Sequence, residues 1–115
     1  MNIFCWNCRG AGKAATVREL RDFTRHFAPT LLCIVETQLE SGRVEALAGT
    51  LGFDSAYAVS SRGRSGGIGL FWNNLINVEI LGYSDYHLDV SVEEPGKEKW
   101  RMTCVYGEAQ THLRH

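Results

Sequence analysis

The feature that most constrains the fold is the unbroken apolar run "LLCIV", which spans Leu31–Val35 and ends at the acidic Glu36. A strand that faces water on one side alternates apolar and polar residues, whereas a strand covered on both faces is apolar throughout. The run therefore predicts a central strand between two layers of the fold. A carboxylate is placed at its end, where the strand holds it rigidly.

A longer helix is predicted before this strand and a shorter one after it. Thr16 followed by Glu19 has the spacing of a capping box at a helix start, and Pro29 predicts where that helix ends. Its inward residues recur at helical spacing: Val17, Leu20, Phe23 and Phe27. The second helix is predicted from Ser41, and its inward residues are Val44, Leu47 and Leu51.

The rest of the chain predicts strands. Residues 2–7 have the composition of a short strand, and beyond Gly52 apolar residues alternate with small or polar ones: Ile68, Leu70 and Trp72, then Ile76, Val78 and Ile80, then Leu88, Val90 and Val92. Residues 94–97 predict a turn that pairs the last of these strands with residues 100–106 in antiparallel fashion. We expect an α/β fold, with a mixed sheet of about six or seven strands and two helices near the N-terminus.

Composition limits the function classes. The chain has 115 residues, so residues 1–115 form one domain or part of one. Hydrophobic residues make up 44% and charged residues 22%, which excludes a disordered chain. The 12 basic and 13 acidic residues give a net charge of −1, so any contact with nucleic acid is local. No apolar run approaches the roughly 20 residues of a membrane span. We therefore expect an intracellular protein, in nucleus or cytoplasm, without a membrane partner.

The stretch "FCWNCRGAGKAAT" contains a C-x-x-C motif at Cys5 and Cys8. Such spacing is typical of a zinc knuckle or a redox pair, but a structural zinc site needs a second close pair of ligands. Only the single residues Cys33 and Cys104 remain, and Cys5 and Cys8 would lie on opposite faces of a strand. Thiols packed as small hydrophobic groups are the preferred interpretation.

The same stretch contains G-x-G-x-x-A at Gly10, Gly12 and Ala15, between a predicted strand and a predicted helix. That is the outline of a dinucleotide-binding motif, and a dinucleotide-binding enzyme remains an alternative. The polar Asn7 and Arg9 interrupt the entry to the glycines, and an antiparallel second half does not continue such a fold. A P-loop is excluded because the spacing of its glycines and lysine is absent.

Four segments in order carry a family resemblance: "WNCRGAG" at 6–12, "LLCIVETQLE" at 31–40, "GGIGLFW" at 66–72 and "WRMTCVYGEAQTHLR" at 100–114. Together they resemble the endonuclease/exonuclease/phosphatase family across the whole chain. They look most like the endonuclease domain of LINE-type retrotransposons, specifically the copies in plant genomes.

The resemblance implies a four-layer α/β sandwich and metal-dependent hydrolysis of phosphate esters, with DNA as the partner. Glu36 matches the family's metal ligand for Mg²⁺ or Mn²⁺, a hard cation that prefers carboxylate oxygen. Asn7 matches the active-site asparagine, and Tyr106 matches a tyrosine near the scissile phosphate. Arg9 and Gln38 are weaker candidates for substrate contacts.

Two parts of the family's catalytic set have no counterpart after Tyr106: an Asp-x-Asn pair and a late Asp-His pair. The segment "SDYH" at 84–87 precedes the tyrosine and is interpreted as a turn and the start of a strand. The resemblance therefore implies the N-terminal half of the sandwich, an endonuclease fragment that is inactive alone. The alternative is a non-catalytic remnant or interaction module.

Half a sandwich also has a consequence for packing. The inner apolar face of the meander would lack its covering sheet and would expose some of Ile68, Leu70, Leu88, Val90 and Val92. We therefore expect self-association through an exposed sheet face.

Overall fold

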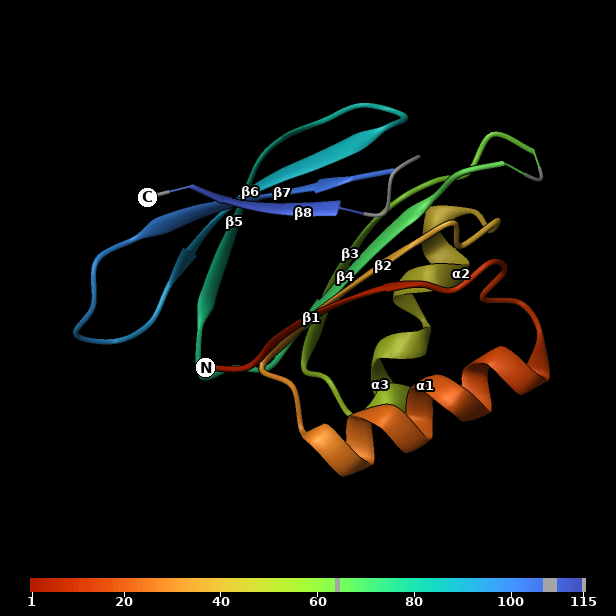
Figure 1. Cartoon of the computed structure of the whole chain (residues 1–115), viewed down its shortest axis with the longest axis horizontal. Helices are drawn as coiled ribbons and strands as arrows, with labels where there is room; N and C mark the ends of the chain where they lie inside the picture. Colours follow the sequence, from red (N-terminus) through yellow and green to blue (C-terminus); the bar gives the residue numbers. More distant parts are fainter. Residues whose placement is uncertain (64, 107–109, 115) are drawn as a thin grey trace.

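The computed structural model describes residues 1–63, 65–106 and 110–114. Its elements follow in the order β1 (Ile3–Asn7), α1 (Ala14–Phe27), β2 (Leu31–Val35), α2 (Ser41–Glu45), α3 (Leu47–Leu51), β3 (Ser55–Val59), β4 (Ile68–Trp72), β5 (Asn77–Tyr83), β6 (His87–Glu93), β7 (Trp100–Val105) and β8 (Gln110–Arg114). The described strands form two four-stranded sheets, in the orders β1-β2-β4-β3 and β5-β6-β7-β8. In Figure 1 the helices lie on one side of the first sheet and the second sheet lies on the other.

The first sheet is mixed, because β1 pairs with β2 in parallel while β4 runs antiparallel to both β2 and β3. All five residues of β2 are buried, which confirms the central strand predicted from its apolar run. Leu32 and Ile34 face the helices, whereas Cys33 and its alternate neighbours face the second sheet. The antiparallel β2–β4 pair also overturns the dinucleotide-binding alternative, since that fold continues as parallel strand–helix units.

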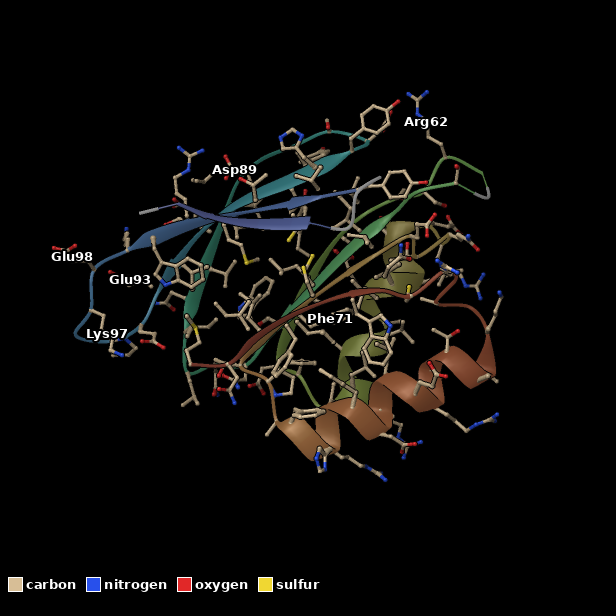
Figure 2. The ribbon with its side chains drawn as sticks, viewed as in Figure 1. Arg62, Phe71, Asp89, Glu93, Lys97 and Glu98 are labelled. Atoms are coloured by element: carbon tan, nitrogen blue, oxygen red, sulfur yellow. The ribbon has the colours of Figure 1, made fainter. Side chains whose placement is uncertain are left out.

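The helices close a first core against this sheet. Phe71 of β4 is fully buried between the sheet and the helices (Figure 2). Edge-to-face contacts join the Phe23 ring of α1 to the rings of Phe4 and Trp6 on β1. Such aromatic pairs stabilise by roughly 0.5–1.5 kcal/mol beyond the area they bury. Leu20 of α1 is also completely buried, as the helical spacing predicted, whereas Phe27 was wrongly predicted to face inward and is 47% exposed near the end of the helix.

Of the two ends predicted for α1 from the sequence, only the C-terminal end agrees with the structure. The capping box predicted at Thr16 is wrong: α1 begins at Ala14, with Lys13 at the N-cap and no side-chain cap hydrogen bond. The preceding loop is held instead by backbone bonds to the end of β2, and these fix where the chain turns into the helix. At the other end Ala28 adopts the left-handed conformation and its N–H bonds to the Thr24 carbonyl, just before Pro29.

The second sheet is an antiparallel meander whose alternation was predicted correctly. Along β6 the residues Leu88, Val90 and Val92 are buried, while the four between and beside them are partly exposed. The turn at 94–97 is present, with the Lys97 N–H bonded to the Glu94 carbonyl at 3.1 Å. Two strands were missed by the sequence patterns: β3 and β8.

The apolar face expected to be exposed is covered by the chain's own second sheet. Ile68 and Leu70 of β4 and Leu88, Val90 and Val92 of β6 are all 0% exposed and belong to one core between the sheets. The prediction of an exposed face was therefore wrong. Its physical reason is that the turn after β4 carries the chain out of the first sheet, so the expected single mixed sheet divides into two facing ones. This face is not available for self-association.

The described residues thus form three layers: helices, a mixed sheet and an antiparallel sheet. This arrangement is consistent with part of an α/β sandwich, and it confirms the predicted α/β class with helices near the N-terminus. None of the described helices is both long and apolar enough to cross a membrane.

Candidate active site

Three loops meet where β1 and β2 end and β4 begins, and we call this the carboxyl edge. The first loop, residues 8–11, follows β1. It forms backbone hydrogen bonds with the end of β2 and with the second loop, which follows β2 from Glu36. The Cys8 N–H bonds to the Val35 carbonyl at 3.0 Å, and the Gly10 N–H bonds to the Glu36 carbonyl at 2.8 Å. The parallel pairing of β1 with β2 therefore continues beyond the strands and fixes both loops together.

The third loop enters β4 and closes the edge from the other side. The Gln38 N–H bonds to the Gly66 carbonyl at 2.9 Å, and the Thr37 N–H lies 3.3 Å from the Gly67 carbonyl. Thr37 is completely buried, and a Cβ added at Gly67 would lie 2.1 Å from its Oγ1. Only glycine permits this approach. Thr37 and Gly67 were missed as structural residues, although the Gly-Gly pair before a predicted strand was a usable indication.

The backbone of the carboxyl edge is strained. Arg9, Glu36 and Gln38 have φ values of 48°, 57° and 58°, in the left-handed region that residues other than glycine rarely occupy. Each such residue costs on the order of 1–3 kcal/mol and persists only where the surroundings impose it. Here the surrounding backbone bonds impose it. Strain of this kind is concentrated at functional sites in proteins, so its location marks this edge as the candidate site.

Asn7 is the last residue of β1 and lies opposite Val35 in the parallel pair. Its Oδ1 is buried and has no hydrogen-bond partner among the described residues. A buried acceptor without a partner costs roughly 1–3 kcal/mol, so this oxygen is positioned for an ion, a water or a substrate donor. Asn7 was predicted as a site residue from sequence, and its unpaired oxygen is what the sequence did not reveal.

Glu36 follows β2 directly and is half-buried. Its backbone carbonyl accepts hydrogen bonds from the Gly10 N–H and from the Cys8 thiol, the latter at 3.4 Å. Burial is the main cause that raises the pKa of Cys8, and the negative charge of Glu36 adds to it. The Glu36 carboxylate therefore lies close enough to Cys8, the residue after Asn7, to affect the pKa of its thiol. No hydrogen bond or ion pair to another described residue holds that carboxylate.

Tyr106 reaches the same edge from the second sheet. It follows β7, and its N–H bonds to the Tyr86 carbonyl at 2.7 Å. A Cβ added at Gly66 would lie 3.7 Å from the Tyr106 ring. The ring therefore packs over the third loop, whose Gly66 carbonyl accepts the hydrogen bond from the Gln38 N–H. A hollow of about 220 Å³ opens beside the ring and is lined by Arg62, Ser65, Asp85, Tyr86 and Tyr106.

The two weaker candidates lie on the rim of the carboxyl edge. Arg9 and Gln38 are both exposed, and the Gln38 side-chain oxygen lies against Gly10, 2.9 Å from a Cβ added there. The structure thus brings Asn7, Arg9, Glu36, Gln38 and Tyr106 to one edge of the fold. Their chemical roles remain predictions.

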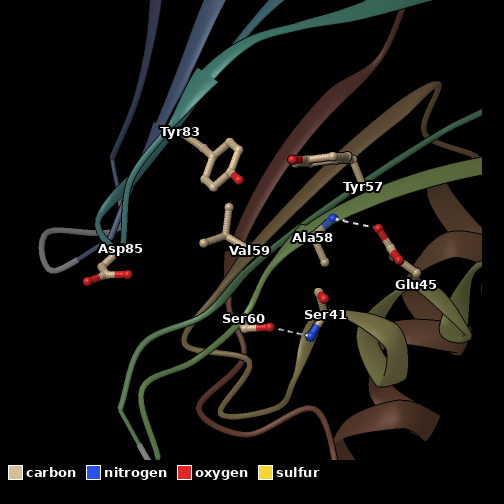
Figure 3. Close-up of a pocket in the computed structure, with 8 residues that line it drawn as sticks. All are labelled: Ser41, Glu45, Tyr57, Ala58, Val59, Ser60, Tyr83 and Asp85. Atoms are coloured by element: carbon tan, nitrogen blue, oxygen red, sulfur yellow. Dashed lines mark hydrogen bonds between the residues drawn. The ribbon is translucent and has the colours of Figure 1, made fainter.

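A second hollow, of about 350 Å³, lies between the sheets on the β3 side (Figure 3). Its polar groups are already engaged: the Glu45 carboxylate accepts from the Ala58 N–H at 3.2 Å, and the Ser60 hydroxyl accepts from the Ser41 N–H at 2.8 Å. None of the five predicted site residues lines it. We do not assign it chemistry.

The "SDYH" segment behaves as a structural turn, as interpreted from sequence. Asp85 forms an ion pair with Arg62 at 2.6 Å, and the Ser84 hydroxyl lies 2.6 Å from Nδ1 of His87. Both polar side chains are therefore occupied locally.

The residues of the carboxyl edge fit a hard divalent cation. In the described part of the chain no three His, Cys, Asp or Glu side chains are grouped to hold a metal by themselves. Mg²⁺, however, is commonly held by one or two protein carboxylates together with waters and substrate phosphate. The Glu36 carboxylate and the unpaired Oδ1 of Asn7 are oxygen donors of the required kind.

Comparison with known proteins confirms the family resemblance. Comparison with curated protein sequences gave no match. Among solved structures, AP endonuclease LMAP from Leishmania major superposes with a TM-score of 0.61 at 22% identity, covering 90% of this chain. The match covers 39% of that protein's chain, and at this identity it supports the fold alone. Residues 4–109 match the model of one family over most of the chain's length. The chain belongs to the Endonuclease/Exonuclease/phosphatase family.

Proposed function

We propose that the carboxyl edge is the metal-binding and phosphate-binding part of a phosphodiester hydrolase that acts on DNA. The observation that carries the proposal is the buried, unpaired Oδ1 of Asn7 at a strained edge that also holds the Glu36 carboxylate. Neither feature stabilises the fold by itself, because both cost free energy until a ligand arrives. Membership of a family of phosphate-ester hydrolases supports the assignment.

Each residue then has a role that suits its chemistry. A bound Mg²⁺ or Mn²⁺ would polarise the phosphate and neutralise charge on the leaving oxygen. Glu36 holds the ion with its carboxylate, and Asn7 orients a ligand through its amide. Tyr106 donates its phenolic O–H to a phosphate oxygen as negative charge develops there.

DNA is the proposed substrate for two reasons. The sequence motifs resemble those of LINE-type retrotransposon endonucleases, and we propose the same origin for this chain. In addition, the exposed Arg9 and Gln38 beside the site can contact a phosphate backbone, although the net charge of −1 provides no general attraction.

We also propose that residues 1–115 cleave DNA poorly by themselves. In residues 1–115 the family's Asp-x-Asn pair and late Asp-His pair have no counterpart, and a positioned base that activates water commonly contributes a rate factor of roughly 10² to 10⁴. The chain spans only 39% of the structure it resembles. The alternative of a non-catalytic interaction module is an outcome of the following test.

The test combines DNA binding with cleavage, using the wild type, Glu36→Ala and the control Glu79→Ala on an exposed position of β5. Fluorescence anisotropy of a labelled duplex should show binding that Mg²⁺ strengthens and that Glu36→Ala weakens, while the control matches the wild type. Nicking of supercoiled plasmid should stay at background. Binding that is indifferent to both Mg²⁺ and Glu36 would favour the interaction module, and nicking lost in Glu36→Ala would show that the chain is active alone.

A further inference from the structure

Three cysteines from three strands meet between the sheets, and the proposed hydrolase does not use them. Cys5 of β1 and Cys33 of β2 are direct partners in the parallel pair, so their side chains leave the sheet on the same face. Cys33 and Cys104 of β7 are completely buried in the core between the sheets. The three thiols therefore form a cluster that links both sheets.

The members of the cluster affect one another's pKa. The pKa of Cys33 is raised well above its usual value, first by hydrogen bonding to Cys104 and Cys5 and then by burial. The pKa of Cys104 is raised as well: hydrogen bonding with Cys33 lowers it, but hydrogen bonding with Cys5 and burial outweigh that effect. The proximity of the three thiols rests on the Cys5–Cys33 register pair and on the core that Cys33 shares with Cys104.

Access to the cluster is asymmetric. Cys5 is exposed, because β1 is the edge strand of the first sheet, whereas Cys33 and Cys104 are 0% exposed. A dissolved oxidant can therefore attack Cys5 first. Cys8 belongs to the other core, on the helix side, and its thiol donates to the Glu36 carbonyl. The cluster is thus separate from the sequence motif C-x-x-C.

We propose that Cys5 and Cys33 form a thiol oxidation site for hydroperoxides. In the first step the Cys5 thiol is oxidised to a sulfenic acid, and hydrogen peroxide is reduced to water. In the second step the Cys33 sulfur attacks the sulfur of the sulfenic acid, the S–O bond breaks, and a disulfide and a second water form. Two thiols lose two electrons and two protons in total, and the peroxide accepts both.

The strand geometry selects Cys33 as the second thiol. Neighbouring strands lie about 4.8 Å apart, which falls within the Cα separation of roughly 4.4–6.8 Å that disulfides require. Cys104 comes from the facing sheet, and facing sheets are typically about 10 Å apart. Its small side chain can reach hydrogen-bonding distance but is less well placed for a covalent bond.

The site lies close to the carboxyl edge. Cys5 is two residues before Asn7 and Cys33 is three residues before Glu36, so the disulfide would join β1 to β2 directly beneath the two candidate site residues. The oxidation itself does not depend on the proposed hydrolase activity, and it can be tested without DNA or metal.

The test is disulfide mapping after treatment of the reduced, full chain with hydrogen peroxide at mildly alkaline pH. Remaining thiols are alkylated, and trypsin then separates the three thiols into peptides 1–9, 26–43 and 102–114. We expect a non-reduced species that joins peptide 1–9 to peptide 26–43. It should persist in Cys8→Ser and disappear in Cys5→Ser, where the replaced side chain is exposed.

Each other outcome overturns the proposal. A disulfide from peptide 1–9 to peptide 102–114 would assign the second thiol to Cys104 instead of Cys33. Persistence of the 1–9 to 26–43 species in Cys5→Ser would assign it to Cys8. Full recovery of alkylated Cys5 and Cys33 after peroxide treatment would show that no oxidation site exists. Circular dichroism of Cys5→Ser before treatment ensures that the loss does not reflect unfolding.

Discussion

The two sheets differ in how far their backbones depart from regular geometry. At the carboxyl edge of the first sheet six residues have positive φ: Arg9, Gly10, Glu36, Gln38, Gly66 and Gly67. In the second sheet and its turns, residues 77–106, Gly96 is the one described residue with positive φ. The second sheet is paired regularly apart from a shift of register in β5 between Ile80 and Gly82. The first sheet combines a regular interior with an end that is rich in residues of positive φ.

The unfavourable backbone conformations of the fold are therefore concentrated at the carboxyl edge. The second sheet contributes one buried face to the core and keeps a polar outer face, where Asp89 bonds to Arg101 and Thr103 (Figure 2). The carboxyl edge contributes a buried acceptor without a partner and several residues in left-handed conformation. The regular part stabilises the strained part, which is the arrangement expected of a binding site.

The largest effect is expected from truncating the core that the two sheets share. Leu88→Ala removes a completely buried side chain of β6 and should lower the free energy of unfolding by about 2–5 kcal/mol. Leu81→Ala on the neighbouring β5, where the side chain is 44% exposed, should cost far less. Urea unfolding measures both. Equal losses would mean that the sheets do not pack face to face.

The next largest effect is expected at Gly67. An alanine there would place its Cβ 2.1 Å from Thr37 Oγ1 at a φ of 96°, so Gly67→Ala should destabilise by about 2–3 kcal/mol. Gly82→Ala in the second sheet is the matched control, because nothing lies within 4 Å of the added Cβ. Urea unfolding again compares the two. A Gly67→Ala variant as stable as Gly82→Ala would remove the evidence for a tightly closed edge.

An intermediate effect is expected from pH. The folded chain raises the pKa of Cys33 and Cys104 above 9.0, so the unfolded chain releases those protons at lower pH. The resulting stability is fully present below pH 9.0 and is lost as pH rises above it. Unfolding free energies between pH 8 and 11 should therefore decline, and less steeply in Cys33→Ser. An identical slope in the variant would show that the buried thiols are not responsible.

The smallest effect is expected on the outer face of the second sheet. Asp89 and Arg101 form an exposed ion pair across β6 and β7, and such pairs contribute roughly 0–1 kcal/mol. Asp89→Asn should therefore change the midpoint of thermal unfolding only slightly, and the change should shrink further at high salt. A large loss would indicate that this face is packed against something.

Much of the regular structure was predictable because it follows from local patterns. The apolar run of β2, the helical spacing of α1, the start of α2 at Ser41 and the alternation of β6 all appear in the structure. The strand β3 was missed because its sequence, SAYAV, is rich in small residues and lacks clear alternation. The division into two sheets depends on which strands pair at long range, and no local pattern encodes that.

The candidate site was predictable in its residues but not in its geometry. Asn7, Glu36 and Tyr106 were named from the family resemblance, and the structure brings all three positions to one edge. The unpaired oxygen of Asn7 and the contact of Gly67 with Thr37 arise only when three distant loops meet. Tertiary contacts of this kind leave no periodic trace in a sequence.

The central claim is that the strained carboxyl edge binds a divalent cation through Glu36. Isothermal titration of Mn²⁺ into the wild type, Glu36→Gln and the control Glu79→Gln tests it directly. The account predicts saturable binding to the wild type and to Glu79→Gln, with affinity lowered by about tenfold or more in Glu36→Gln. Binding to Glu36→Gln with wild-type affinity, or no saturable binding to the wild type, would contradict it.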